Sequence, residues 1–260
     1  MALTALASVG LWRNDAHDYW WAGEDGALVG PLPSVTGIIR DAVDKSGPLI
    51  GWATNLTAAF AVERADLLAD MAKAGGAPET ARWLAQQAKR DRDEKGQRGT
   101  RVHALCDAIA RGETVEPTPD EAPYIAGFRT FLREREPRIV ATEQMGVNLA
   151  LGYAGTFDLI VEMDGKRWML DVKTGKGLYP EMGAQLAAYT KFDFLGKPND
   201  PTRYPMPRCQ RFGILHLRPE GYGLAPFAVD KTTWAAFQAM CVVSRWVRGP
   251  AKTIMNGGRA

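Results

Sequence analysis

Apolar residues recur with a helical period through much of the first half of the chain and with a strand-like period through much of the second. Helical patterns cover residues 49–73, 78–95, 98–111 and 121–135, with glycine- and proline-rich breaks between them. Before them, residues 11–33 are rich in aromatic residues and glycine, which indicates short strands and turns, and Ser34 is a candidate helix N-cap. The first half is therefore expected to be mainly helical.

The pattern changes after Pro137. Strands are predicted at 138–148, 152–163 and 166–175, and Asp164-Gly165 is the expected turn of a hairpin between the last two. A helix at 182–195 follows, then a loop rich in proline and basic residues, strands at 211–219 and 222–230, and a closing helix at 231–247. From the helix at 121–135 onward, the expected order of elements is therefore α, β, β, β, α, β, β, α.

The composition bounds the class of protein. With 260 residues, of which 46% are apolar, the chain can bury a core as one domain or as one domain with an appended lobe. Its formal net charge is only +2, so attraction to nucleic acid would have to come from local patches or a bound metal. The overall charge therefore selects no partner.

The cysteines and the N-terminal residues indicate a compartment. Cys106, Cys209 and Cys241 are widely spaced and odd in number, which disfavours a disulfide framework, a zinc ribbon or a cysteine-ligated iron–sulfur cluster. No basic region precedes the short N-terminal apolar stretch, and no apolar run approaches about 18 residues. We therefore expect a soluble, cytoplasmic protein without a membrane span.

Charged residues interrupt the predicted hairpin. Side chains alternate between the two faces of a strand, so Asp171 and Lys173 are expected on one face and Leu170 and Val172 on the other. An uncompensated buried charge costs several kcal/mol. These residues are therefore expected to be paired, to bind a metal or to line an open cleft.

Further polar residues lie on the neighbouring predicted elements. Asp158 is on the preceding strand and Glu143 on the one before, while Gln185 and Tyr189 are four residues apart on one face of the next helix. Two carboxylates on adjacent strands suit Mg²⁺ or Mn²⁺, and the chemistry this predicts is phosphodiester hydrolysis. Lys173 would position or deprotonate the attacking water, or stabilise developing negative charge. The sequence leaves these roles open.

The chain contains three motifs in this order: G-T-F-D at 155–158, D-V-K-T-G at 171–175 and Q-L-A-A-Y at 185–189. Together they resemble the PD-(D/E)XK nuclease superfamily and specifically its RecB-like exonuclease branch. The resemblance is specific from about residue 98 to 190, and LPSVTGIIR and GWATNLTAAFAVE are similar to the opening of phage-encoded members. It implies an α/β fold with a restriction-endonuclease-like core at 97–260, in which helices flank a mixed central β-sheet. A mainly helical N-terminal lobe is expected at 1–96.

The resemblance also implies a set of site residues. The implied catalytic residues are Lys173, Asp158, Asp171, Gln185 and Tyr189, and the implied ligands of Mg²⁺ or Mn²⁺ are His103, Asp158, Asp171 and Glu143. Some RecB-like relatives carry four cysteines for an iron–sulfur cluster, which this chain lacks, so none is expected. The chain also has no Walker A pattern and hence no helicase motor.

The function that the resemblance implies is a DNA exonuclease of phage-type recombination, repair or replication, acting in the cytoplasm of a bacterial host. DNA would be its substrate, and a single-strand-annealing or single-strand-binding protein its partner. The alternatives are a structure-specific endonuclease or resolvase, and a nuclease-derived module that binds DNA without cleaving it. A further alternative is that Asp158, Asp171 and Lys173 form only a structural ion-pair network.

Some residues allow both a structural and a functional interpretation. His103 borders an apolar helical stripe, where a buried structural histidine is the alternative to a ligand. The run at 89–101 holds six basic and three acidic residues and is either a solvated helix end or a phosphate-contacting rim. Arg203, Arg208 and Arg211 in the proline-rich loop are similar candidates for phosphate contacts.

Overall fold

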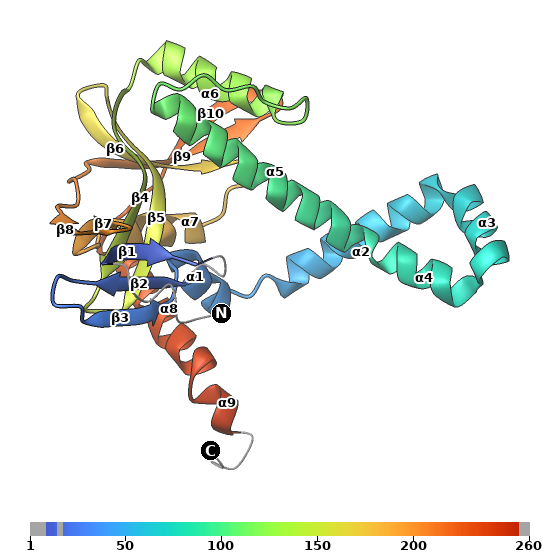
Figure 1. Cartoon of the computed structure of the whole chain (residues 1–260). Coiled ribbons are helices and arrows are strands. Elements are labelled where there is room, and N and C mark those ends of the chain that lie inside the picture. The colour runs from blue at the N-terminus through green and yellow to red at the C-terminus, as the bar shows by residue number, and fades with distance from the viewer. Residues whose placement is uncertain (1–8, 15–17, 255–260) are drawn as a thin grey trace. The chain divides into compact units, whose positions relative to one another are not determined.

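The computed structural model describes residues 9–14 and 18–254 of the chain (Figure 1). The chain forms two compact units, of which the first combines Met1–Val43 with Val102–Ala260 and the second is Asp44–Arg101. We call them the sheet unit and the helical unit. This division differs from the expected one at 1–96 and 97–260, because the first 43 residues group with the sheet.

A seven-stranded sheet with the strand order β10-β9-β6-β5-β4-β7-β8 is the centre of the sheet unit. Its strands are β4 (Arg138–Asn148), β5 (Tyr153–Met163), β6 (Lys166–Lys173), β7 (Phe194–Lys197), β8 (Asp200–Tyr204), β9 (Arg211–Arg218) and β10 (Gly221–Pro226). Strands β6 and β9 are parallel, while the other neighbours are antiparallel, so the sheet is mixed. The predicted α/β class with helices around a mixed sheet is confirmed.

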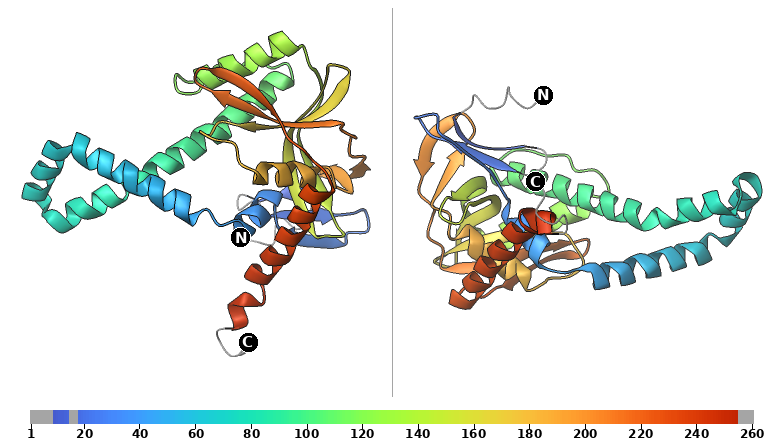
Figure 2. Two further views of the ribbon diagram at one scale, coloured as in Figure 1. Left: turned by 180° about the vertical axis from the view of Figure 1, so that it is seen from behind. Right: turned by 90° about the horizontal axis from the view of Figure 1, so that it is seen from below.

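Helices cover both faces of this sheet (Figures 1 and 2). On one face lie α1 (Val35–Ala42), α7 (Glu181–Tyr189) and α8 (Lys231–Arg248), and their core includes Phe157, Met169, Leu186 and Phe237. On the other face lie α6 (Ala122–Arg135) and residues 102–110 of α5 (Gln87–Ala110), with Phe128, Phe131, Leu159 and Leu217 in the core. Burial of these apolar side chains from two directions is the main force that holds the layers together.

The turn between β5 and β6 has the predicted geometry. Asp164 has a φ of 52° and Gly165 a φ of 69°, the left-handed conformation that both central residues of a type I′ hairpin turn adopt. Met163 pairs with Lys166 directly across the turn, and the antiparallel pairing continues to Leu159 and Leu170. The register of the two strands that carry the predicted aspartates is therefore set locally.

The predicted helix at 182–195 is wrong in its second half. Helix α7 ends at Tyr189, and Phe194 and Leu195 belong to β7, where they pair with Val147 and Gly146 of β4. The pairing places both side chains in the core, and this burial overrides a local pattern that also fits a helix. The hairpin of β7 and β8 thus occupies part of the segment that we expected to be a loop.

A small N-terminal sheet explains why the first residues group with the sheet unit. Strands β1 (Gly10–Arg13), β2 (Tyr19–Ala22) and β3 (Leu28–Leu32) pair in that order, as the aromatic segment predicted. Leu11 and Trp21 pack with Val147 and Phe194 of the large sheet in one apolar cluster. The Ser34 N-cap is also confirmed, because its Oγ accepts a 3.0 Å hydrogen bond from the backbone N–H of Gly37.

The helical unit consists of α2 (Ser46–Glu63), α3 (Ala65–Gly75), α4 (Ala77–Ala85) and residues 87–101 of α5. The predicted helix at 49–73 is divided near Arg64 into α2 and α3. Within residues 44–101, all of which the structure describes, only Thr80 and Ala88 are buried. After α8, a short helix α9 (Ala251–Ile254) follows, and the described part of the chain contains no helix with the length and apolarity needed to cross a membrane.

One ionic contact joins the two outer helices α1 and α8, and it predicts a pH-dependent stability. Asp41 accepts hydrogen bonds from Ser244 Oγ at 2.7 Å and from Arg248 Nε at 2.5 Å. Burial acts to raise the pKa of Asp41, but these two partners outweigh it and lower the pKa below 3.8. This contact therefore stabilises the fold above the unfolded-state pKa and is lost as the pH falls through the folded-state pKa.

We expect Asp41→Asn to lower the free energy of unfolding by about 1–2 kcal/mol at pH 7, because a charge-assisted hydrogen bond is lost. The difference from the wild type should shrink as the pH falls below 3.8. Urea unfolding followed at several pH values measures both effects, with Glu220→Gln, which removes an exposed ion pair with Arg218, as the control. Equal stability of Asp41→Asn and the wild type at pH 7 would contradict the assignment.

Candidate metal centre

The candidate centre forms where β5 and β6 stop pairing. Asp158 and Asp171 are the next residues in register after the last paired residues, Leu159 and Leu170. The carboxylate of Asp158 takes over part of the backbone pairing, since its Oδ2 accepts a 2.6 Å hydrogen bond from the N–H of Val172. Asp158 is thereby fixed at the opening between the two strands.

Two further potential ligands surround Asp158. His103, from the sheet-unit part of α5, places its Nδ1 3.4 Å from Asp158 Oδ2. Glu143 of β4 lies between Thr142 and Gln144, which pair with Leu159 and Phe157, so it stands opposite Asp158. One ligand atom each of His103, Glu143 and Asp158 lies within 4.8 Å of the others. The structure thus brings together three of the four predicted metal ligands.

The backbone of Glu143 is strained. Its φ is 46°, in the left-handed region that a residue with a Cβ rarely occupies within a strand. Such a conformation costs on the order of 1 kcal/mol and persists only where the surroundings enforce it. The paired residues on either side of Glu143 enforce it here, and the result is a third donor beside Asp158 and His103.

A cavity of about 10 Å³ lies among these side chains. His103, Asp107, Glu143 and Asp158 contribute its polar lining, while Cys106 and Phe128 are among the residues that close it. A void of this size is close to the volume that one water molecule or one small ion needs. Carboxylate oxygens and one imidazole nitrogen around such a void fit a hard or borderline divalent cation.

Asp107 is a residue that the sequence reasoning missed. It lies one helical turn after His103 and accepts a 2.9 Å hydrogen bond from Thr142 Oγ1, while its other oxygen pairs with Arg111. Asp107 thus ties α5 to β4 beside the centre and adds negative charge to it. The signal was the four-residue spacing from His103, which places both side chains on one helix face.

The three potential ligands perturb one another's protonation. Burial lowers the pKa of His103, but the Asp158 carboxylate outweighs burial and raises it to about 8. Burial also raises the pKa of Asp158, but the charge of His103 outweighs it and lowers that pKa. For Glu143, burial and then the charge of Asp158 raise the pKa to about 7. The metal-free cluster therefore tends to hold protons that a cation would displace.

The remaining predicted residues form a second group beside the first. Gln185 of α7 donates from Nε2 to Asp171 Oδ1 at 2.7 Å and to the Tyr189 hydroxyl at 2.9 Å. The Lys173 ammonium forms an ion pair with Asp171 Oδ2. Asp171 is outside the cluster of three ligand atoms, so its role as a ligand stays a prediction.

The second group contains the ion pair of Lys173 and Asp171. Burial lowers the pKa of Lys173, but the neighbouring Asp171 and Asp158 carboxylates outweigh it and raise the pKa above 10.5. Burial raises the pKa of Asp171 to about 6 against the opposing effect of Lys173. Burial and the Asp171 charge also raise the pKa of Tyr189, which is therefore neutral. Lys173 is thus a protonated cation at neutral pH.

His216 lacks the sequence context of His103, and its predicted role is structural. It lies opposite Lys173 in the parallel pairing of β6 and β9. Its Nε2 donates a 2.6 Å hydrogen bond to the carbonyl oxygen of Gly175, two residues after Lys173. His216 therefore anchors the segment that leaves the centre.

The fold and the donor cluster define an α/β protein with a candidate metal centre. Comparisons of the chain with protein-family models and with curated proteins find no match. The chemistry of its own residues is therefore the basis for a functional proposal.

We expect Mg²⁺ or Mn²⁺ to raise the unfolding temperature of the wild-type protein, because a ligand that binds only the folded state stabilises it by about 2.7 kcal/mol at 100 times its dissociation constant. The shift should be larger at pH 8.5 than at pH 6.5, since a cation must displace the proton of His103, whose pKa is about 8.

Thermal melts of the wild type, His103→Ala and Asp158→Asn measure this effect, and both substitutions should abolish most of the shift. Asp164→Asn, in the exposed hairpin turn, is the matched control for loss of one carboxylate. If neither metal shifts the wild-type melt at either pH, the cluster is a structural ion-pair network and not a metal centre.

The left-handed backbone of Glu143 predicts that stability and metal binding favour different residues at this position. Asn adopts the left-handed conformation more readily than Glu, so Glu143→Asn should stabilise the metal-free protein by about 1 kcal/mol while it removes a ligand. The raised pKa of Glu143 means that the folded protein loses stability as the pH rises from 4.5 past 7, so the gain should be larger at pH 8 than at pH 5.

Urea unfolding in EDTA, compared with melts in Mn²⁺, checks both parts of this expectation. Glu143→Gln is the matched control, because it removes the charge but keeps the strained backbone, and its gain should be smaller. Destabilisation by Glu143→Asn in EDTA would show that the φ of 46° carries no strain cost.

Proposed function

We propose that this protein is a metal-dependent nuclease that hydrolyses phosphodiester bonds in DNA. The observation that supports it most is the placement of a protonated lysine next to a cluster of hard donors, with both fixed by the strands that carry them. Phosphodiester hydrolysis needs both parts, because negative charge develops on a substrate that is already anionic.

His103, Glu143 and Asp158 are the residues that would hold the ion, and the two carboxylates among them suit Mn²⁺ or Mg²⁺. When bound, such an ion supplies a water of lowered pKa and neutralises charge on the phosphate. Asp107 holds α5 against β4 through Thr142 and so keeps His103 next to Glu143. The backbone N–H of Val172 likewise holds the Asp158 carboxylate in place through a hydrogen bond.

Lys173 would stabilise the negative charge of the phosphate in the transition state. A general base must be unprotonated, and the neighbouring carboxylates hold the pKa of Lys173 above 10.5. Asp171 orients the ammonium group, Gln185 holds Asp171 through Oδ1, and Tyr189 interacts with the Gln185 amide. This chain of contacts fixes the direction of the cation before a substrate arrives, as electrostatic catalysis requires.

The resemblance to RecB-like PD-(D/E)XK nucleases supports an exonuclease that acts in phage-type recombination, repair or replication. The chain has every catalytic side chain that the resemblance implies, namely Asp158, Asp171, Lys173, Gln185 and Tyr189. A single-strand-annealing or single-strand-binding protein is the partner that this role would involve.

This function is tested by digestion of end-labelled linear single- and double-stranded DNA in Mg²⁺ or Mn²⁺. A covalently closed circle is digested alongside. We expect the wild type to degrade linear DNA and to leave the circle intact. Lys173→Ala should lower kcat by about 10²–10³-fold with little change in KM, because it removes charge stabilisation in the transition state.

Lys176→Ala, three residues further along the same segment and exposed, is the matched control and should keep its activity. Cleavage of the circle would indicate an endonuclease instead of an exonuclease. Folded wild-type protein that binds DNA but cleaves no substrate in either metal would contradict catalysis and indicate a DNA-binding module.

A further inference from the structure

A second cavity, of about 680 Å³, lies in the sheet unit away from the metal cluster. Its walls are the C-terminal end of α7, the first turn of α8, the start of β9 and the loop that precedes β9. The volume is within the range of roughly 300–1,000 Å³ that small-molecule sites occupy. This cavity is therefore large enough for a ligand, unlike the cavity of about 10 Å³ at the metal cluster.

Aromatic rings and cations line this cavity together. Trp234 and Phe212 are half-buried in its walls, while the basic residues Lys191, Arg208 and Lys231 are exposed around them. The Lys191 ammonium lies 5.8 Å from the centre of the Trp234 ring. An aromatic interior with exposed cations favours a planar ligand that carries negative charge.

Two acidic side chains also line the cavity, fewer than its three cations, and both are held in place by hydrogen bonds. Asp193 Oδ2 accepts a 2.7 Å hydrogen bond from the N–H of Leu149. Asp230 is the N-cap of α8 and accepts from both the N–H and the hydroxyl of Thr233. The first turn of this 18-residue helix also lines the cavity, through Lys231 and Trp234.

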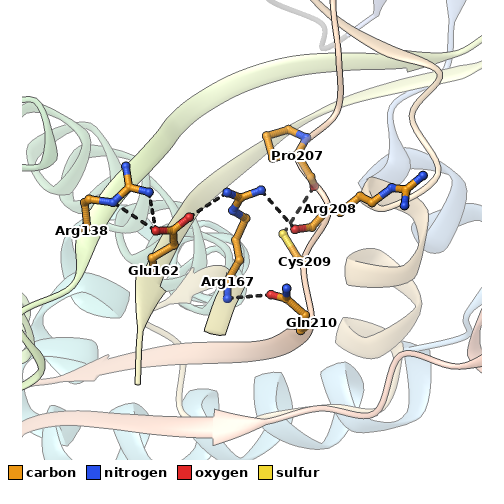
Figure 3. A network of polar contacts seen from close by, with 7 residues as sticks. All are labelled: Arg138, Glu162, Arg167, Pro207, Arg208, Cys209 and Gln210. Carbon is orange, nitrogen blue, oxygen red and sulfur yellow. Dashed lines mark hydrogen bonds and ion pairs between the residues drawn. The ribbon is translucent and has the colours of Figure 1, made fainter. Parts of the chain in front are cut away.

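The wall that carries Arg208 is anchored, but its guanidinium is not used in the anchoring (Figure 3). Arg167 of β6 donates to the carbonyl oxygen of Arg208 at 3.4 Å, and its backbone N–H donates to Gln210 Oε1 at 2.7 Å. In Figure 3 the Arg208 side chain points away from Arg167 and from the Glu162 carboxylate that pairs with it. A cation on an anchored backbone, directed away from the Glu162 carboxylate, is a suitable phosphate contact.

The geometry points to a nucleotide-binding site, in which a heterocyclic base stacks on Trp234 and a phosphate group lies among Arg208, Lys231 and Lys191. This site is separate from the metal centre, because the two cavities share no lining residue. Gln185 and Tyr189 of α7 contact the Asp171 group, whereas Ala187 of α7 and Lys191, two residues after the helix ends, line the cavity. The proposal therefore does not depend on nuclease activity.

Equilibrium dialysis of labelled adenosine 5′-monophosphate against the full chain, in EDTA and at low salt, tests this site. We expect saturable binding of the monophosphate, with adenosine alone and inorganic phosphate each bound at least tenfold more weakly. Arg208→Gln and Trp234→Ala should each weaken the monophosphate at least tenfold, since one removes a phosphate contact and the other the stacking surface.

Arg218→Gln is the matched control, because it removes the same charge at the other end of β9 and should leave binding unchanged. Trp234→Phe keeps a ring for stacking and separates loss of stacking from loss of folding, so it should retain most of the affinity. If a single-stranded hexanucleotide competes with the labelled monophosphate, the ligand of this site is a nucleotide within a nucleic-acid strand. If only mononucleotides compete, the ligand is a free nucleotide.

The absence of saturable binding of both the monophosphate and the hexanucleotide would overturn the proposal. Equal binding by the wild type, Arg208→Gln and Trp234→Ala would overturn it as well. Because EDTA removes divalent metal, these outcomes are independent of whether the protein cleaves DNA.

Discussion

The hydrogen bond from the Val172 N–H to the Asp158 carboxylate is the contact on which the candidate centre depends. It forms where β5 and β6 have stopped pairing, so a side chain replaces part of a backbone ladder. A buried backbone N–H without a partner is costly, and a carboxylate is the strongest acceptor available for it. The same bond holds Asp158 beside His103 and opposite Glu143, which makes the end of the hairpin pairing the place where donors gather.

Much of this arrangement could be predicted from the sequence because its signals are local. Asp164-Gly165 sets the hairpin, and the hairpin register places Asp158 next to Asp171. The four-residue spacing of Gln185 and Tyr189 likewise predicts that both meet the same group. Each of these inferences needs only the turn preference or the helical and strand periods, which act over a few residues.

Other features depend on tertiary contacts that no local rule contains. Glu is unfavourable in the left-handed conformation, so nothing in the sequence around Glu143 predicts its φ of 46°. Phe194 and Leu195 suit a helix as well as a strand, and only their pairing with β4 decides between the two. The grouping of the first 43 residues with the large sheet rests on the packing of Leu11 and Trp21 against Val147 and Phe194, which are distant in sequence.

Helix α7 connects the two candidate sites of the sheet unit. It is short and almost entirely buried, so both of its long faces contact other parts of the unit. One face presents Gln185 and Tyr189 to the buried Asp171 and Lys173 pair, where low exposure strengthens electrostatic interactions. The helix also contributes Ala187 to the wall of a larger cavity with exposed cations, and Lys191 joins that wall just after the helix ends. A small shift of α7 would change the Asp171 contact and the cavity wall together, because a rigid helix moves both faces at once.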